Sequence, residues 1–245
     1  MAEKMAEMQE LAAVPLLSAL SDESRAKLVE NAILHGVAAG TVLFEQGQMP
    51  KFQHIIVSGS VHLFARSVEG REVLIEVVEA PDLVIPAAVV TGSPYLMQAR
   101  VSEPSRFLLV QAATFRAAVA RDPVLAREVI GSLAGQFRRM VRQIKNLKLR
   151  SSTQRVGCYI LALSMRQGNP TQVVLPHEKN LIASELGITR ESFSRALASL
   201  QRFGIAVHGE TISILDRERL AKESMPDPLI DGPESRPIMS KLLVA

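Results

Sequence analysis

Four polar side chains in the carboxyl-terminal third of the chain have types and spacing that suit the recognition of DNA bases. Arg190, Glu191, Ser194 and Arg195 recur about one helical turn apart in GITRESFSRALASLQRFG. The apolar residues of that stretch also follow helical spacing and are Phe193, Ala196, Leu197 and Leu200. If these face a core, the four polar side chains share the exposed side. A helix fits the major groove, where a guanidinium can pair with guanine and a carboxylate can accept from cytosine.

The flanking residues predict the elements that would position this helix. Leu181, Ile182 and Leu186 indicate a short helix upstream, and Gly187 supplies a tight turn after it. Thr189 then caps the second helix. Residues 204–214 read as two short strands around a His-Gly-Glu turn. We predict a helix-turn-helix with a β wing; the alternative is a helical hairpin whose outer face is merely solvated.

Basic residues are concentrated around this segment. Residues 138–202 contain twelve Lys or Arg and three Glu, a local charge of about +9 in a chain whose total is +3. Such a concentration suits the neutralisation of DNA phosphates.

Composition restricts the remaining function classes. No apolar run approaches the roughly twenty residues that cross a bilayer, and the start, MAEKMAEMQE, is polar, so we expect a cytoplasmic protein with no membrane partner. The single cysteine, Cys158, excludes an internal disulfide and an iron–sulfur cluster, and its apolar neighbours indicate packing. Catalytic residues are not predicted: the chain has no glycine-rich phosphate loop, metal-binding His-Glu spacing or nucleophile elbow.

The first half of the chain has short strands separated by glycines. Residues 40–47 predict one strand, residues 55–64 predict two strands or one bent by Gly59, and a hairpin at Glu69-Gly70 leads into residues 73–78. This regularity indicates a β sandwich or barrel. Ser21 is placed to cap a helix before the strands.

A long helix is predicted between the two halves, from about Pro123 to Leu149. Its apolar positions recur on average every 3.5 residues and are Ile130, Leu133, Phe137, Met140, Ile144 and Leu147. This period is typical of a coiled-coil seam and predicts a homodimer, which would present two recognition helices to a palindromic site. The alternative is a helix packed on its own β domain.

The order of these parts resembles the bacterial CRP/FNR family of transcription regulators. The resemblance covers roughly residues 14–221 and rests on GTVLFEQGQ with IIVSGSVHLF, on RVGCYILAL, and on GITRESFSRALASLQRFGI. It implies an α+β fold with four parts. The first part, at 1–122, is a β-roll sensor domain of the cyclic-nucleotide-binding type, which is a double-stranded β-helix. It is followed by a dimerisation helix at 123–150, a winged helix-turn-helix at 151–223, and a mobile tail at 224–245. The apolar tail positions Ile238, Leu242, Leu243 and Val244 have no assigned role.

The resemblance also implies roles in DNA binding. Glu191, Ser194 and Arg195 fall on the family's E-x-x-S-R base-reading pattern, and Arg190 falls where one branch has arginine. Arg195 is expected to read guanine and Glu191 the cytosine side of a TTGA-like half-site. The residues expected at phosphates are Thr189, Ser192, Lys179 and Asn180. RNA polymerase is the expected partner if the protein is an activator.

The effector is less constrained by the sequence. At the places where the family's nucleotide-binding branch holds cyclic AMP with Gly-Glu and Arg-Ser pairs, this chain has Pro86 and Ala87, then Tyr95 and Leu96. None of the four carries a charge, and proline lacks an amide donor. Cyclic AMP is therefore not expected. Residues 1–30 also lack the cysteine cluster of the oxygen-sensing branch.

What remains resembles the branch that regulates denitrification and nitric-oxide responses, in which some members bind haem. His35, His54 and His62 are candidate axial ligands, with a surface imidazole as the alternative for each. The expected function is a homodimeric DNA-binding regulator that senses a small effector other than cyclic AMP, such as haem with nitric oxide or a redox signal. The alternative is a constitutive DNA-binding regulator whose sensor pocket is a packed core.

Overall fold

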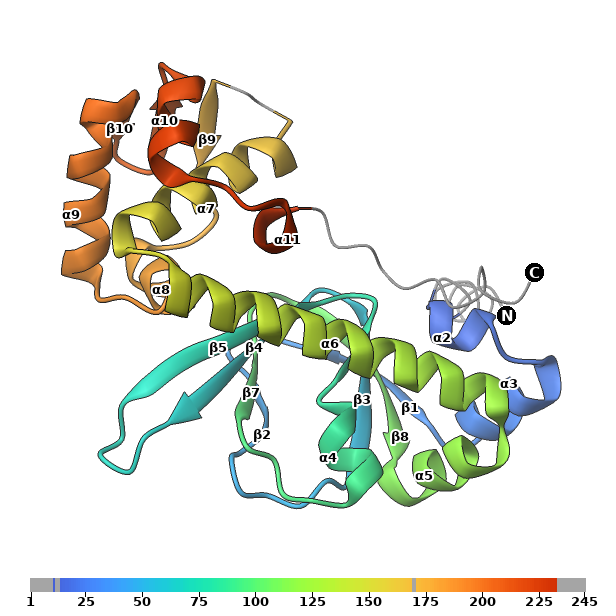
Figure 1. The fold of residues 1–245 in the computed structure, drawn as a ribbon. Helices are drawn as coiled ribbons and strands as arrows, with labels where there is room; N and C mark the ends of the chain where they lie inside the picture. Colours follow the sequence, from blue (N-terminus) through green and yellow to red (C-terminus); the bar gives the residue numbers. More distant parts are fainter. Residues whose placement is uncertain (1–10, 12–13, 169–170, 233–245) are drawn as a thin grey trace. The chain divides into compact units, whose positions relative to one another are not determined.

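The structure, a computed structural model, describes residue 11, residues 14–168 and residues 171–232. These residues form two compact units that meet within one long helix, the first extending to Gln136 and the second beginning at Phe137 (Figure 1). The amino-terminal MAEKMAEMQE segment and the tail positions Ile238, Leu242, Leu243 and Val244 lie outside the described residues.

The first unit contains two antiparallel four-stranded sheets. The first sheet has the order β1-β8-β3-β6 and the second has the order β2-β7-β4-β5. Its strands are β1 (Ile33–Val37), β2 (Val42–Phe44), β3 (Phe52–Ser58), β4 (Ser60–Arg66), β5 (Glu72–Glu79), β6 (Asp82–Val84), β7 (Gln98–Val101) and β8 (Ser105–Gln111). The β roll predicted from the glycine-separated strands is confirmed. Gly59 divides β3 from β4, and its φ of +88° explains why a glycine stands there.

The two sheets enclose one apolar core, and helices cover the outer face of the first sheet. Ile56 and Phe107 of the first sheet pack with Val61 and Leu63 of the second, and all four are buried. On the outer face, Ile55 packs among residues of five helices. These helices are α2 (Pro15–Ser18), α3 (Asp22–Val29), α4 (Pro86–Thr91), α5 (Ala112–Arg121) and the first half of α6 (Pro123–Leu149). The Ser21 side chain accepts a hydrogen bond from Ser24 N at the start of α3, as predicted.

The second unit combines the end of α6 with a helical domain that carries a small sheet. Its further elements are α7 (Ser152–Arg166), β9 (Gln172–Val174), α8 (Lys179–Glu185), α9 (Arg190–Leu200), the 3₁₀ turn Gln201–Phe203, β10 (Ile205–His208), β11 (Thr211–Ile214), α10 (Arg217–Ser224) and α11 (Pro228–Asp231). The sheet has the order β10-β11-β9 and is antiparallel. The sequence predicted β10 and β11, and it missed β9, which forms the third strand.

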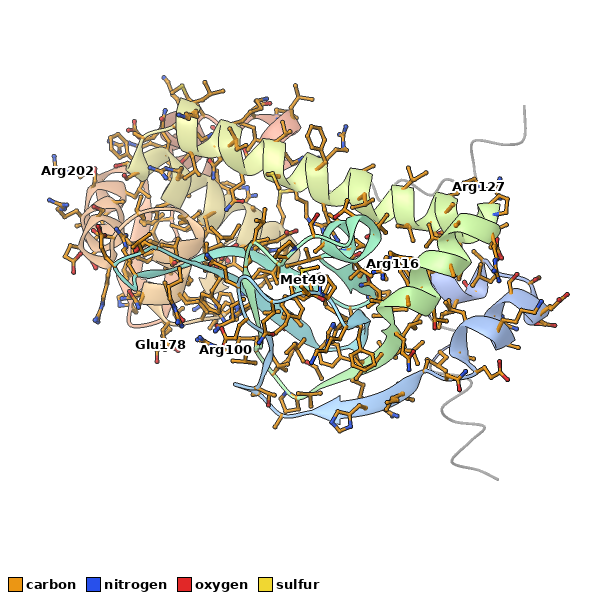
Figure 2. All side chains as sticks on the ribbon, turned by 90° about the horizontal axis from the view of Figure 1, so that it is seen from below. Met49, Arg100, Arg116, Arg127, Glu178 and Arg202 are labelled. Atoms are coloured by element: carbon orange, nitrogen blue, oxygen red, sulfur yellow. The ribbon has the colours of Figure 1, made fainter. Side chains whose placement is uncertain are left out.

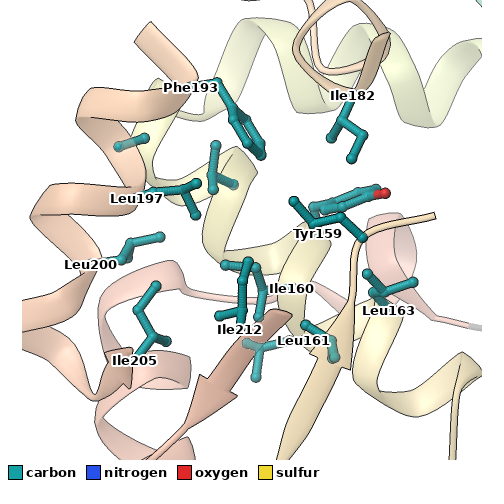
Figure 3. Close-up of a cluster of buried hydrophobic side chains, with 14 of the residues drawn as sticks. Tyr159, Ile160, Leu161, Leu163, Ile182, Phe193, Leu197, Leu200, Ile205 and Ile212 are labelled. Carbon is teal, nitrogen blue, oxygen red and sulfur yellow. The ribbon is translucent and has the colours of Figure 1, made fainter. Parts of the chain in front are cut away.

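The core of the second unit fixes how α9 is turned. Figure 3 shows Phe193, Leu197 and Leu200 extending from α9 toward Ile160 of α7 and Ile212 of β11. Phe193 and Leu200 are fully buried. The helical spacing of these apolar residues in the sequence is therefore the spacing of a core face.

The segment after α10 differs from the mobile tail predicted for residues 224–245. Its described part contains the short helix α11, whose first turn is capped by the Asp227 side chain at Leu229 N. Asp231 of α11 forms an ion pair with Arg150. The sequence did not indicate α11 because four residues are too few for a periodic pattern, and the ion pair joins positions 81 residues apart.

Candidate nucleic-acid interface

The predicted base-reading side chains lie together on the solvent side of α9. Arg190, Glu191, Ser194 and Arg195 are all exposed, whereas the apolar face of the same helix is buried. A hydrogen bond from its own backbone amide lowers the pKa of Glu191, which keeps this carboxylate ionised at neutral pH. The exposed face thus offers two cations, one anion and one hydroxyl, the groups that can read base edges.

The start of α9 is held by its cap. Thr189 Oγ1 accepts a hydrogen bond from Ser192 N at 3.2 Å and donates to Ser192 Oγ at 3.1 Å. Arg195 Nη2 donates to the same Ser192 oxygen at 3.1 Å. Thr189 and Ser192, which were predicted to contact phosphates, therefore orient the helix start and one guanidinium in this structure. Lys179 and Asn180 lie in the first turn of α8, with Lys179 half-buried and Asn180 exposed.

The turn between α8 and α9 closes with a Schellman motif. Ile188 N donates to Ala183 O and Gly187 N donates to Ser184 O, while Gly187 adopts a φ of +64°. A β-carbon at Gly187 would lie 2.5 Å from Leu147 Cδ2 of α6. The end of α6 and the turn are therefore in close contact, and only a glycine fits this position.

Arg155 of α7 holds the same turn from the other side. Its Nη1 donates to Leu186 O at 2.6 Å and to Gly187 O at 3.3 Å, so a cation satisfies carbonyls at the negative end of α8. Burial lowers the pKa of Arg155. The sequence analysis counted Arg155 only as part of the basic concentration and missed this structural role.

Internal partners take up part of the predicted basic concentration. Besides Arg155, the cations of Arg142, Lys145 and Arg150 bond to groups of residues 227–232. Arg190, Arg195 and Arg202 are exposed, and Figure 2 shows Arg202 pointing outward at the edge of its unit. Four of the twelve cations are thus engaged within the chain, whereas Arg190, Arg195 and Arg202 remain exposed on α9 and the turn after it.

The wing follows α9 directly. β10 and β11 pair from Ile205 opposite Ile214 to His208 opposite Thr211, and Gly209 forms the turn with a φ of +64°. β9 adds Val173, which is fully buried opposite Ile212. A helix-turn-helix with a three-stranded wing is therefore complete in the described residues.

Both halves of the chain match known domain families. Residues 34–122 match the model of the cyclic nucleotide-binding domain, and residues 154–223 match the model of the Crp-like helix-turn-helix domain. The chain belongs to the CRP/FNR family of transcription regulators. The family resemblance of the sequence motifs is thereby confirmed.

Individual CRP/FNR relatives are distant in sequence. The chain is 26% identical over 190 residues to the CRP-like cAMP-activated global transcriptional regulator of Mycobacterium tuberculosis, covering 76% of this chain and 85% of that protein. It is 27% identical over 192 residues to the fumarate nitrate reduction regulatory protein of Klebsiella oxytoca, covering 76% of each. A CRP/FNR-family transcriptional regulator from Thermus thermophilus has the same fold, with a TM-score of 0.63, 21% identity, and coverage of 79% of this chain and 99% of that chain.

The predicted effector positions of this CRP/FNR chain do not all face one pocket. Pro86 is buried at the start of α4, and Ala87 and Leu96 are exposed. Tyr95 is 2% exposed, and its ring stacks on Phe44 with 3.6 Å between centroids. Two of these four residues are thus buried and two exposed, and an aromatic ring stacks against Tyr95.

A surface hollow of about 280 Å³ does occur in the first unit. It is lined by Glu45, Gln46, Phe64, Arg66, Ser67, Val68, Glu72 and Gln98. None of the predicted effector positions lines this hollow. Its main charges are paired, because Glu72 accepts from Arg66 at 2.6 Å and from Arg100 at 3.1 Å.

The three candidate haem-ligating histidines lie on three different strands. His35 is exposed on β1, whereas His54 on β3 and His62 on β4 are buried. His54 lies near the rings of Phe44 and Phe107, and its Nδ1 has no hydrogen-bond partner. This burial lowers the pKa of His54 to about 4, so the imidazole is neutral at physiological pH.

Across the described residues, no helix is both long enough and apolar enough to span a bilayer. No group of three or more His, Cys, Asp or Glu side chains in the described part of the chain is arranged to hold a metal ion.

Replacement of Gly187 by Ala tests the close contact between Leu147 of α6 and the turn that joins α8 to α9. We expect the backbone strain of a positive φ, about 1–2 kcal/mol, plus displacement of Leu147, to reduce the free energy of unfolding in urea titrations. Gly209→Ala is the matched control, because Gly209 has the same φ of +64° and no atom near its absent β-carbon. If Gly187→Ala and Gly209→Ala reduced the free energy of unfolding equally, the Leu147 contact would have no effect on stability.

The buried His54 predicts a pH dependence of stability. Because its folded pKa of about 4 lies below the usual 6.5, the unfolded chain binds more protons between these values. The free energy of unfolding should then fall as pH drops from about 6.5 to 4, by about 3 kcal/mol in all. His54→Leu should remove this part of the slope in unfolding titrations. A constant difference between the two proteins at every pH would contradict the assignment.

Proposed function

We propose that this CRP/FNR regulator binds a palindromic, TTGA-like DNA site as a homodimer. The exposure of Arg190, Glu191, Ser194 and Arg195 on one face of α9 supports this proposal most directly. Arg195 reads a guanine through two hydrogen bonds, and Glu191 accepts from the paired cytosine. The phosphate contacts come from Thr189, Ser192, Lys179 and Asn180, after Ser192 releases Arg195.

The proposed dimer forms through an apolar stripe on α6. Phe137 is 65% exposed, and Ile130, Met140 and Ile144 are each at least half exposed, which is unusual for large apolar side chains along one helix. Leu147 is 40% exposed and also lies against the helix turn. Leu133 instead packs partly against the core of the first unit. Pairing two such stripes would remove the exposed apolar area from water and relate two copies of α9 by a two-fold axis.

The proposed effector is a small molecule other than cyclic AMP. The segment from Ile85 to Met97 contains no charged residue, and Pro86 removes an amide that could bind phosphate. The Phe44–Tyr95 stack fills the space between the sheets. These features support an effector other than a cyclic nucleotide.

Haem is the cofactor we propose to test first, together with nitric oxide. The buried His54, whose Nδ1 has no hydrogen-bond partner, offers a neutral nitrogen for an iron. The exposed His35 is a weaker candidate, and His62 is buried on the other sheet. A redox signal remains an alternative input. RNA polymerase is a further proposed partner if the protein activates transcription, and the cytoplasm is the proposed location.

The second candidate is a constitutive regulator without an effector, which the packed interior of the β roll favours. Absorbance and thermal-shift titrations with haem and with cyclic AMP separate the two proposals. A Soret band that His54→Leu removes supports haem sensing. A flat response to every ligand supports the constitutive regulator.

Replacement of Arg195 by Ala tests the base-reading role. We expect a loss of about 1–3 kcal/mol in binding to the palindromic duplex and a relaxed preference at the guanine position. Lys179→Ala is the control, and it should weaken binding to all sequences about equally. Fluorescence anisotropy with palindromic and scrambled duplexes measures both effects. If Arg195→Ala kept full discrimination between the duplexes, another residue would read the base.

Replacement of Phe137 by Asp tests the dimer seam. A charge buried between two apolar stripes costs several kcal/mol, so we expect dissociation into monomers in analytical ultracentrifugation. Arg138→Asp is the control, because Arg138 is also exposed but lies outside the apolar stripe. A Phe137→Asp protein that sediments like the unmodified chain would place the dimer contact elsewhere.

A further inference from the structure

The segment that follows α10 is fastened to the last turns of α6. Arg150 Nη1 and Nη2 donate to Asp231 Oδ1 and Oδ2 at 2.8 and 2.5 Å. Lys145 Nζ lies 3.4 Å from Asp227 Oδ2, and Arg142 Nη1 donates to Gly232 O at 3.3 Å. Two cations on α6, Arg142 and Lys145, and Arg150 just after its end are thus matched by one carbonyl and two carboxylates within residues 227–232.

The central pair of this contact is shielded from water. The Arg150 side chain is 6% exposed and that of Asp231 is 19% exposed. Arg150 also donates to Asn146 Oδ1, and Asp231 also accepts from Asp227 N. A bidentate pair with further hydrogen bonds at low exposure holds its geometry far better than a solvated ion pair does.

The same segment is anchored to α7 through the end of α10. Ser224 is fully buried, and its carbonyl accepts from Cys158 Sγ at 3.3 Å. A β-carbon at Gly157 would lie 2.0 Å from Ser224 Oγ, so α10 and α7 are in close contact at this point. The chain is therefore fixed to α7 at residue 224 and to α6 at residues 227–232.

Between these two attachments lies the junction where α6 ends and α7 begins. α6 ends at Leu149, and Ser151 caps α7 with Gln154 in a reciprocal capping box. Arg155, in the first turn of α7, holds the helix turn that precedes α9. The angle between α6 and α7 therefore determines where α9 points relative to the α6 stripe.

We propose that residues 225–232 form an ionic clasp that fixes the angle between α6 and α7 and thereby sets the pose of the DNA-binding helix. This inference rests on the proposed function for its effect on DNA, and its structural part is independent of that function. Two copies of α9 can meet both half-sites only if each is held at a defined angle. The clasp supplies that restraint within one chain.

The first test uses hydrogen exchange of the full-length chain without DNA. Asp231→Asn removes one partner of the buried pair, and we expect amide exchange at residues 148–155 to accelerate by about tenfold or more. Glu218→Gln is the matched control, because it removes one negative charge from the exposed face of α10. A double variant with Arg150→Asp and Asp231→Arg restores a pair and should recover part of the protection.

The outcomes separate the clasp from a general loss of structure. If amide exchange in Asp231→Asn accelerates only at residues 148–155, with unchanged exchange in β9 to β11, the result supports the clasp. Equal exchange in Asp231→Asn and the unmodified chain would overturn it, as would acceleration of the whole unit that the double variant does not reverse.

The second test measures DNA discrimination by anisotropy with palindromic and scrambled duplexes. A loosened junction should lower the ratio of specific to non-specific affinity several-fold in Asp231→Asn. A merely electrostatic effect would instead strengthen binding to both duplexes equally and overturn the regulatory part of the inference. If the unmodified chain itself fails to discriminate, the proposed function is wrong, and the exchange result still decides whether the clasp exists.

Discussion

The burial of one face of α9 is the constraint on which the rest of the structure depends. Phe193 and Leu200 are fully buried against α7 and the wing, and burial of side chains of this size contributes about 1.5–3 kcal/mol each. An exposed ion pair contributes about 0–1 kcal/mol. The apolar face therefore decides the orientation of α9, and the polar residues on the other side remain available to DNA.

α7 connects this helix to the rest of the chain through specific polar contacts. Arg155 binds the carbonyls at the end of α8, and the close approach at Gly157 brings in α10. The chain then returns to α6 at Asp227, which pairs with Lys145, and to Arg150 just after α6 at Asp231. Packed helices and partly buried hydrogen bonds thus form a continuous set of contacts from the end of α6 to α9, the physical connection on which the proposed clasp depends.

Local patterns in the sequence predicted the elements, and long-range contacts explain what they missed. The apolar spacing of Phe193 to Leu200 and the 3.5-residue apolar period of residues 130–147 identified two helices within a few residues of their observed bounds. β9 was missed because its pairing with Ser213 and Ile212 joins positions far apart in the chain. Arg155 and Asp231 have partners 31 and 81 residues away, so neither could be told from a solvated charge. Likewise, the burial of His54 and His62 depends on sheet packing that no local pattern records.

Hydroxyl-radical footprinting on a duplex with a TTGA-like palindrome tests the central claim most directly. Two exposed copies of α9 related by a two-fold axis should protect two segments centred about one helical turn, roughly 10 base pairs, apart. The protection should disappear when both half-sites are scrambled. A single protected segment, or uniform protection that does not depend on sequence, would contradict this account.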